Sequence, residues 1–190
     1  MYVRGAKKRE EVWLLDEIER LGLDEAAFRS REYVVALDEE TGEKAGFGRL
    51  RLHDEVCELT SLGVVEPWRG QGVGAHVVER LVDRADDEGF GTVYALAPEP
   101  NYLLQFGFEP VERSALPEIL EERLDAKRED GEVIGMELPV EAFSMPERLR
   151  ERFKQAAPAD DGRESAGEIP AEEFGIDPDT ATYKYDTGRR

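Results

Sequence analysis

The residues most able to do chemistry lie in a glycine-rich stretch that reads Arg69-Gly70-Gln71-Gly72-Val73-Gly74. Before it, the hydrophobic run Leu62–Val65 ends in a turn that contains Pro67, and a helix is predicted to begin at Gly72. The first turn of a helix leaves backbone N–H groups without partners, and the helix dipole favours negative charge there. Glycines let an anion approach that backbone closely. The stretch therefore predicts a phosphate-binding loop, to which Arg69 adds a positive charge.

The type of phosphate ligand follows from the context of the loop. The pattern Gly70-x-Gly72-x-x-Ala75 formally fits the dinucleotide fingerprint, but that fingerprint expects an opening strand–helix–strand unit and a parallel sheet. Here three hairpin-like strands come first. The chain contains no Gly-Lys-Ser/Thr sequence, so a nucleoside-triphosphate loop is excluded as well.

The elements that must position the loop alternate between strand and helix patterns. Period-two and β-rich runs predict strands, and apolar spacings of three and four residues predict helices. The predicted strands are Tyr2–Ala6, Tyr33–Leu37, Ala45–His53, Val56–Val65, Thr92–Ala97, Phe108–Glu112 and Val133–Leu138. The predicted helices are Arg9–Leu21, Asp24–Arg29, Gly72–Glu88, Asn101–Phe106 and Leu116–Arg128. The three strands between Tyr33 and Val65 are expected to form an antiparallel meander.

One domain is expected over residues 1–140, followed over residues 141–190 by a helix and an acidic tail. The sequence Ser144-Met-Pro-Glu147 resembles a capping box and predicts a helix that extends to about Gln155. The stretch Pro158–Asp179 is rich in Pro, Gly, Ala and acids, and we expect it to be largely disordered.

Acidic residues dominate the composition. The 44 Asp and Glu against 25 Lys and Arg give a formal net charge of −19, which argues against nucleic-acid binding because such a surface repels phosphate backbones. The acidity fits either an acidic interaction region or a protein that stays hydrated in concentrated salt. The acids are spread along the whole chain, which favours the second interpretation. We therefore expect a cytoplasmic protein from a halophilic archaeon.

Cysteine content and hydropathy indicate the cellular compartment. The single cysteine, Cys57, excludes an internal disulfide and indicates a reducing compartment. No apolar run approaches the length of about 18 residues that a membrane span needs, and the N-terminus lacks the apolar core of a secretory signal. We expect no membrane partner, and a homodimer is left open.

The motifs resemble those of the GNAT acyltransferase superfamily. Its cofactor motif, Arg/Gln-x-x-Gly-x-Gly/Ala, is matched by Arg69 to Gly74, and the short helix Asn101–Phe106 with Gly107-Phe108 after it resembles a second family motif. The order of the predicted elements is also the family's order. The resemblance covers roughly Tyr2 to Leu138. It implies an α/β (α+β) GNAT fold, with a mixed, mostly antiparallel sheet of about six or seven strands flanked by helices.

The resemblance also implies how the cofactor binds. The co-substrate would be acetyl-coenzyme A, with its pyrophosphate on the backbone N–H groups of the Arg69–Gly74 loop. Its pantetheine arm would pair like an extra strand with Leu62, Gly63 and Val64. The family's fourth and fifth strands splay apart in a V, and the thioester would lie in that gap. No metal is expected, since His53, Cys57 and Glu58 lack a ligand spacing.

Catalysis in the family is direct transfer to an amine, which needs a base and a proton donor for the thiolate. Glu58 is the candidate base, acting through water; its alternative is an ordinary salt bridge. The usual tyrosine of the donor position is replaced here by Leu103. Tyr102 is one residue earlier, so either a local distortion brings it into use or the thiolate takes a proton from water.

The stretch from Tyr102 to Glu118 is similar to amino-acid N-acetyltransferases of the N-acetylglutamate synthase type. Strand alternation places Arg49 and Arg51 on one face, where they would bind a substrate carboxylate or simply face solvent. The resemblance implies an N-acetyltransferase for the primary amine of a small molecule, with amino acids among the candidates. A protein or peptide N-acetyltransferase and a non-catalytic acyl-CoA sensor are the alternatives.

Overall fold

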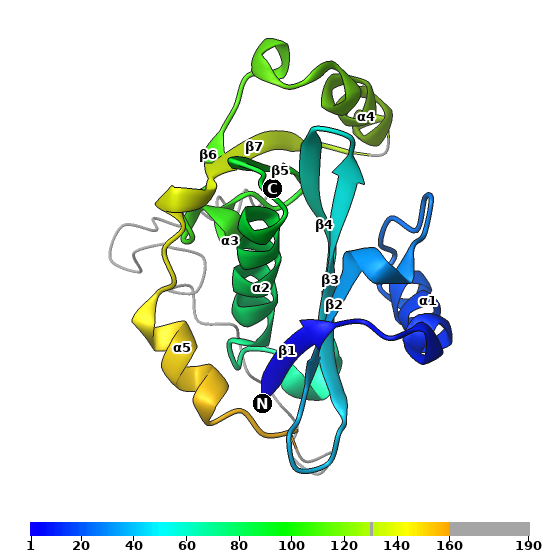
Figure 1. Cartoon of the computed structure of the whole chain (residues 1–190), viewed down its shortest axis with the longest axis vertical. Coiled ribbons are helices and arrows are strands. Elements are labelled where there is room, and N and C mark those ends of the chain that lie inside the picture. Colours follow the sequence, from blue (N-terminus) through cyan, green and yellow to red (C-terminus); the bar gives the residue numbers. More distant parts are fainter. Residues whose placement is uncertain (130, 160–190) are drawn as a thin grey trace, which may run out of the picture.

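A seven-stranded sheet forms the centre of the molecule in this computed structural model, which describes residues 1–129 and 131–159 (Figure 1). The strand order is β1-β2-β3-β4-β5-β7-β6. Adjacent strands are antiparallel except for the parallel pair β4 and β5. The strands are β1 (Tyr2–Gly5), β2 (Tyr33–Leu37), β3 (Lys44–His53), β4 (Val56–Val64), β5 (Thr92–Ala97), β6 (Glu109–Pro110) and β7 (Ile134–Pro139). The predicted mixed, mostly antiparallel sheet is therefore confirmed.

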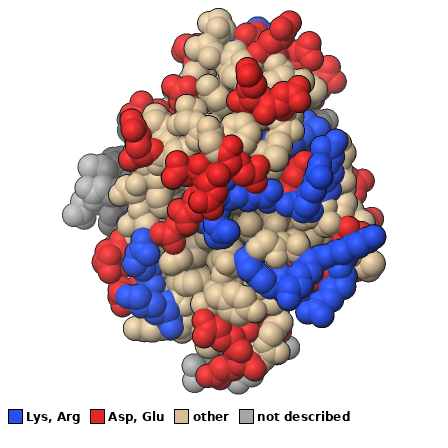
Figure 2. All heavy atoms as spheres, in the orientation of Figure 1, with Lys and Arg blue, Asp and Glu red and all other residues tan. Residues whose placement is uncertain are grey.

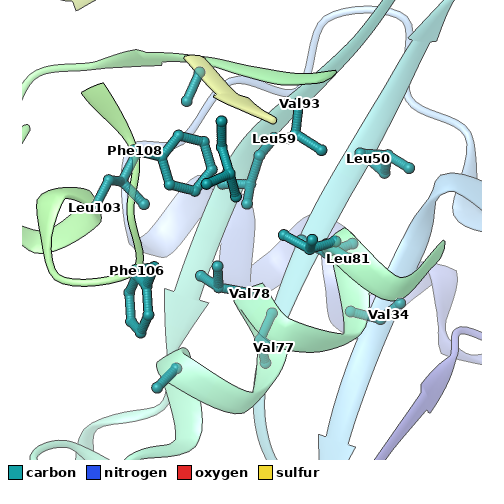
Figure 3. Close-up of a cluster of buried hydrophobic side chains, with 14 of the residues drawn as sticks. Val34, Leu50, Leu59, Val77, Val78, Leu81, Val93, Leu103, Phe106 and Phe108 are labelled. Atoms are coloured by element: carbon teal, nitrogen blue, oxygen red, sulfur yellow. The ribbon is translucent and has the colours of Figure 1, made fainter. Parts of the chain in front are cut away.

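Helices cover both faces of the sheet. They are α1 (Glu11–Arg20), α2 (Val73–Asp87), α3 (Asn101–Leu104), α4 (Glu118–Arg128) and α5 (Glu147–Lys154). The apolar side of α2 packs on one face, where Val77, Val78 and Leu81 meet strand residues of the main core (Figure 3). This contact is close, because a Cβ on Gly48 of β3 would lie 2.7 Å from Val77. On the other face, α1 packs against β2 and β3.

A bulge in β4 and an early end to its pairing with β5 open the middle of the sheet. Phe47 of β3 pairs with Gly63, but Arg49 pairs with Thr60, so β4 has one extra residue at this point. Ser61 lies in the bulge with φ of +48°. The parallel pairing between β4 and β5 stops at Leu59 and Ala95. Beyond that pair the two strands leave a gap.

Several local predictions need correction. Asp24–Arg29 does not form a helix: it is a turn with Ala27 at φ of +49°, although the Asp24 carboxylate accepts a hydrogen bond from Ala26 N as a cap would (2.9 Å). The strand predicted over Phe108–Glu112 is reduced to Glu109–Pro110. Most of the expected disorder of Pro158–Asp179 falls on residues outside those described.

The predicted C-terminal helix is present as α5 and packs against the rest of the protein. Leu149 and Phe153 are 2% and 8% exposed and belong to the main core beneath α2. The chain reaches α5 through a segment anchored by a hydrogen bond from Ser144 N to Phe106 O (3.1 Å). The helix therefore shares the core that carries the glycine-rich loop.

Candidate functional site

The glycine-rich loop joins the end of β4 to the start of α2. A short turn, Glu66–Trp68, leads into it, and the buried Trp68 side chain holds this turn against the core. Gly70 and Gly72 have φ of +72° and +76°, a conformation that L-residues with side chains rarely adopt. Within the described residues, no backbone acceptor pairs with the N–H groups from Gly70 to Ala75. The loop therefore presents consecutive backbone donors at the positive end of a helix, which suits a phosphate.

A cavity of about 370 Å³ lies against this loop. Most of the residues predicted to bind the cofactor line it together: Leu62, Gly63, Val64, Arg69, Gly70, Gly72, Val73 and Gly74. Gln71 is the exception, because its side-chain amide hydrogen-bonds to backbone atoms of Pro67 and Ala157. The loop and the end of β4 thus form walls of one cavity.

Two further cavities extend this space through the gap in the sheet to α4. One of about 460 Å³ lies between β4 and β5 and shares Leu23, Leu62, Glu99 and Tyr102 with the first. Another of about 570 Å³ continues from it to Arg123 and Lys127 of α4, sharing six lining residues with it. The three cavities thus adjoin one another in a row, from the phosphate loop, past the splayed strands, to a group of charged side chains.

Tyr102 lies where the first two cavities meet. Its ring packs edge-on against Phe106, with centroids 5.4 Å apart, and its hydroxyl lies 2.7 Å from the position that a Cβ on Gly74 would take. Leu103 is 5% exposed and points into the core. The short helix α3 therefore brings Tyr102 to both cavities, whereas Leu103 borders only the cavity between the strands. Its role as proton donor stays a prediction.

Glu58 is fully buried on β4 and is held by an ion pair. Its Oε2 accepts a hydrogen bond from Arg123 Nε at 2.8 Å and lies 3.1 Å from His53 Nε2. Burial would raise the pKa of the Glu58 carboxyl, but the hydrogen bonds with His53 and Arg123 and the charges of Arg123 and Lys127 outweigh it and lower that pKa. Glu58 does not line the three cavities. The salt-bridge interpretation describes these contacts, and a role as base stays a prediction.

The sequence predicts that Arg49 binds a substrate carboxylate or faces solvent, whereas the structure buries it among polar partners. Its side chain is 1% exposed, and its three nitrogens donate to Glu32 Oε2 (2.9 Å), Ala26 O (2.8 Å) and Ala27 O (2.6 Å). Arg49 thus anchors the turn after α1. Arg51 lies on the same face, with Nη1 3.7 Å from Asp24 Oδ2, and does not line the three cavities.

Two cations from α4 line the cavity at the far end of this row. Arg123 Nη2 donates to Asp24 Oδ2 at 2.8 Å. Lys127 Nζ lies 3.8 Å from the same oxygen and 4.0 Å from Glu58 Oε1, and it lines both of the outer cavities. The spacing on α4 contained a usable signal, because Arg123 and Lys127 are four residues apart and so lie on one side of the helix.

Glu99 is a second residue that sequence reasoning missed. It is exposed, follows the end of β5, and lines both the loop cavity and the cavity between the strands. Ligands commonly bind beyond the carboxyl ends of parallel strands, and β5 is parallel to β4. The signal available in the sequence was therefore the position of Glu99 just after the predicted strand Thr92–Ala97.

Two other features bear on the class of site. Among residues 1–129 and 131–159, no group of three or more His, Cys, Asp or Glu is placed to hold a metal ion. In the same part of the chain, no helix combines the length and the apolar character that a bilayer crossing needs.

Comparison with known proteins agrees with this geometry. A family model described as the acetyltransferase (GNAT) family matches residues 4–108, more than half of the chain. N-acetylglutamate synthase from Neisseria gonorrhoeae, complexed with coenzyme A and N-acetyl-glutamate, superposes with a TM-score of 0.62 at 16% identity. That match covers 73% of this chain and 34% of the synthase, so this chain spans about a third of that protein.

Two further solved structures share the fold over nearly their whole length. A Mycobacterium tuberculosis protein in complex with CoA and NLQ has a TM-score of 0.64 at 20% identity, and the match covers 73% of this chain and 99% of that one. An aminoglycoside 6′-N-acetyltransferase complexed with coenzyme A has a TM-score of 0.54 at 17% identity, with 74% and 97% covered. At these identities the structures establish a shared fold.

Proposed function

Since the chain belongs to the acetyltransferase (GNAT) family, we propose that it transfers the acetyl group of acetyl-coenzyme A to the primary amine of a small molecule. The observation that carries this proposal is the path of adjoining cavities from the phosphate loop to α4. In it, coenzyme A enters from the loop and the amine enters from α4. The solved relatives that hold coenzyme A support this choice of co-substrate.

The cofactor would thread the gap between β4 and β5. Its pyrophosphate binds the loop donors from Gly70 to Gly74, and its pantetheine arm pairs with the backbone of Leu62–Val64, which β5 leaves unpaired. The Val64 N–H, or that of Gly63, polarises the thioester carbonyl. Holding the thioester and the amine together in this gap supplies much of the acceleration, because it removes the entropy cost of bringing two reactants together.

The chemical step moves one acyl group and one proton. The amine nitrogen attacks the thioester carbon, a C–N bond forms and the C–S bond breaks, and the proton lost by the amine passes to a base. Two carboxylates are candidates: Glu58, from the sequence, and Glu99, which lines the cavities. The departing thiolate takes a proton from Tyr102 or from water.

We propose an amino acid as the first class of acceptor to test. Arg123 and Lys127 place two positive charges at the α4 end of the path, although the chain as a whole carries −19. A carboxylate-bearing amine could bind there with its nitrogen directed toward the gap. The relative that was crystallised with N-acetyl-glutamate supports this class. The net charge of −19 supports the proposal that the protein works in concentrated salt.

The test is a thiol-release assay in molar salt with acetyl-coenzyme A and a panel of acceptors. The panel pairs amino acids with their decarboxylated amines, and it includes polyamines and basic peptides. We expect acceleration by amino acids. Acceleration by peptides alone would favour a peptide N-acetyltransferase, and tight binding of acetyl-coenzyme A in calorimetry without turnover of any amine would favour a sensor.

Substitution of the two carboxylates separates their roles. If Glu99 is the base, Glu99→Gln lowers kcat and removes the acidic limb of the pH–rate profile, whereas Glu58→Gln does not. The reverse result would assign the base to Glu58. Normal pH profiles in both variants would refute carboxylate catalysis by either residue.

A further inference from the structure

We propose that α5 forms one wall of the cofactor site and that Arg152 binds the pyrophosphate of coenzyme A. This inference rests on the proposed function, because it assumes coenzyme A as the ligand of the loop. It concerns a helix that lies outside the matched family region, residues 4–108. Three kinds of observation support it: backbone contact with the loop, side-chain docking on α2, and charge.

The backbone of α5 lies directly against the phosphate loop. A Cβ on Gly72 would fall on the carbonyl oxygen of Leu149 and would lie 3.2 Å from Phe153 N. The Leu149 side chain lines the same cavity as the loop glycines. Gly72 therefore gives α5 the room to approach, and any ligand in that cavity contacts α5 as well as the loop.

Side chains fix α5 to the first turns of α2. The Phe153 ring stacks on His76 with centroids 3.8 Å apart and an interplanar angle of 18°. Arg150 Nη2 donates to Glu79 Oε1 at 2.8 Å. Because Leu149 and Phe153 are also buried, the helix is a built part of the site.

The residues that follow α5 run along the outer side of the loop. The Gln71 side chain pairs with the backbone of Ala157 in both directions, donating to its oxygen at 2.7 Å and accepting from its nitrogen at 2.8 Å. Ala159 N donates to Pro67 O at 2.9 Å. These bonds hold the loop in place, and within the described residues no backbone acceptor pairs with its N–H groups from Gly70 to Ala75.

The charge of α5 is opposite to that of the chain. It carries four cations (Arg148, Arg150, Arg152 and Lys154) against two acids in eight residues, and basic side chains gather where α5 lies, at the lower left of Figure 2. Three of these cations donate to side chains nearby: Arg148 to Gln105, Arg150 to Glu79 and Lys154 to Glu151. Arg152 Nη1 lies 3.4 Å from Gly70 O, on the loop itself.

A phosphate on the loop donors would therefore lie beside the Arg152 guanidinium. A charge-assisted bond from Arg152 to phosphate is stronger than its long, exposed bond to Gly70. The planar guanidinium can donate two parallel bonds to phosphate oxygens, which a lysine cannot. The loop supplies neutral donors from one side, and α5 supplies the positive charge from the other.

The experiment measures ligand affinity by calorimetry on the full chain at one fixed salt concentration. The ligands are coenzyme A, dephospho-coenzyme A, which lacks the 3′-phosphate, and pantetheine, which lacks all the phosphates. The variants are Arg152→Ala, the charge-conserving Arg152→Lys, and Arg148→Ala as a matched control on the same helix. Thermal unfolding checks that each variant keeps its fold.

If Arg152 binds the pyrophosphate, Arg152→Ala weakens coenzyme A and dephospho-coenzyme A alike by about tenfold or more, which is ~1.4 kcal/mol per tenfold. Arg152→Lys restores part of this loss, whereas pantetheine affinity and the Arg148→Ala variant are unchanged. A loss confined to coenzyme A would overturn the pyrophosphate assignment in favour of the 3′-phosphate. Unchanged or tighter binding in Arg152→Ala would overturn the inference and leave the proposed function standing. A wild-type chain that binds no coenzyme A would refute the proposed function itself.

Discussion

Gly70 and Gly72 form a matched pair for testing how the loop and α5 depend on each other. Both have positive φ, +72° and +76°, so an alanine at either position costs roughly 1–2 kcal/mol in backbone conformation. They differ in their surroundings. A Cβ on Gly70 meets nothing within 4 Å, whereas a Cβ on Gly72 coincides with the backbone of α5 at Leu149.

Gly72→Ala must therefore move α5, and Gly70→Ala need not. Full exposure of Leu149 and Phe153 would cost about 1.5–3 kcal/mol each. Because α5 would shift only in part, we expect Gly72→Ala to lower the free energy of unfolding by about 3 kcal/mol more than Gly70→Ala. Loss of α5 docking also reduces the surface buried by folding, so the urea dependence of unfolding should be shallower in Gly72→Ala.

The assay is urea unfolding of both variants and the wild type at the same high salt concentration, followed by fluorescence and circular dichroism. Equal midpoints and equal slopes for the two variants would refute the argument that α5 rests on Gly72. Coenzyme A affinity, measured in parallel, should fall further in Gly72→Ala, since it loses the α5 wall as well as the loop conformation.

Three other predictions concern single side chains. Lys127→Met should raise KM for carboxylate-bearing acceptors about tenfold in the thiol-release assay, while KM for their decarboxylated amines stays unchanged. An equal rise in both KM values would show that Lys127 does not bind the carboxylate. Hydrogen bonds from Arg4 lower the pKa of the Glu10 carboxyl to about 2; burial opposes this shift, and a hydrogen bond from Lys7 N–H adds to it. The ionised carboxyl therefore contributes fully to stability above about pH 4.5, and this contribution is lost as the pH falls toward 2. Glu10→Gln should remove roughly 2 kcal/mol of that acid-dependent stability, after allowance for solvent screening, and identical acid unfolding of variant and wild type would contradict this. Burial, with a smaller effect of the Glu88 charge, raises the pKa of Cys57 to about 12. The native protein should therefore not react with the disulfide reagent of a thiol-release assay. A rapid reaction before unfolding would contradict the buried position of Cys57.

The sequence was sufficient to predict the loop and the sheet because their signals are local. The glycines and Pro67 lie within a few residues of one another, and α2 repeats its apolar residues at helical spacing. The same local reasoning named Tyr102 as a candidate proton donor without settling which way it points. The structure shows that Tyr102 lines both the loop cavity and the cavity between the strands, whereas the buried Leu103 lines only the second of these.

The charged contacts could not be predicted because their partners are far apart in the chain. Arg123 binds Asp24 across 99 residues, and Arg49 is satisfied by a turn that follows α1. Alternation along β3 correctly placed Arg49 and Arg51 on one face, but it could not show that this face is covered. The amphipathic pattern of α5 likewise predicts a helix that packs, without indicating which surface receives it.

The end of pairing between β4 and β5 gives the sheet two edges in its interior. Edges elsewhere in proteins invite foreign strands, and they are usually blunted by charge, by bulges or by short length. Here the backbone of Leu62 to Val64, which β5 leaves unpaired, lines the cavities together with Leu23 and Tyr102. A strand from another chain cannot enter such a slot, but a narrow extended molecule can. The protein can thus keep an unpaired edge at its centre without the aggregation that the same edge would cause on its rim.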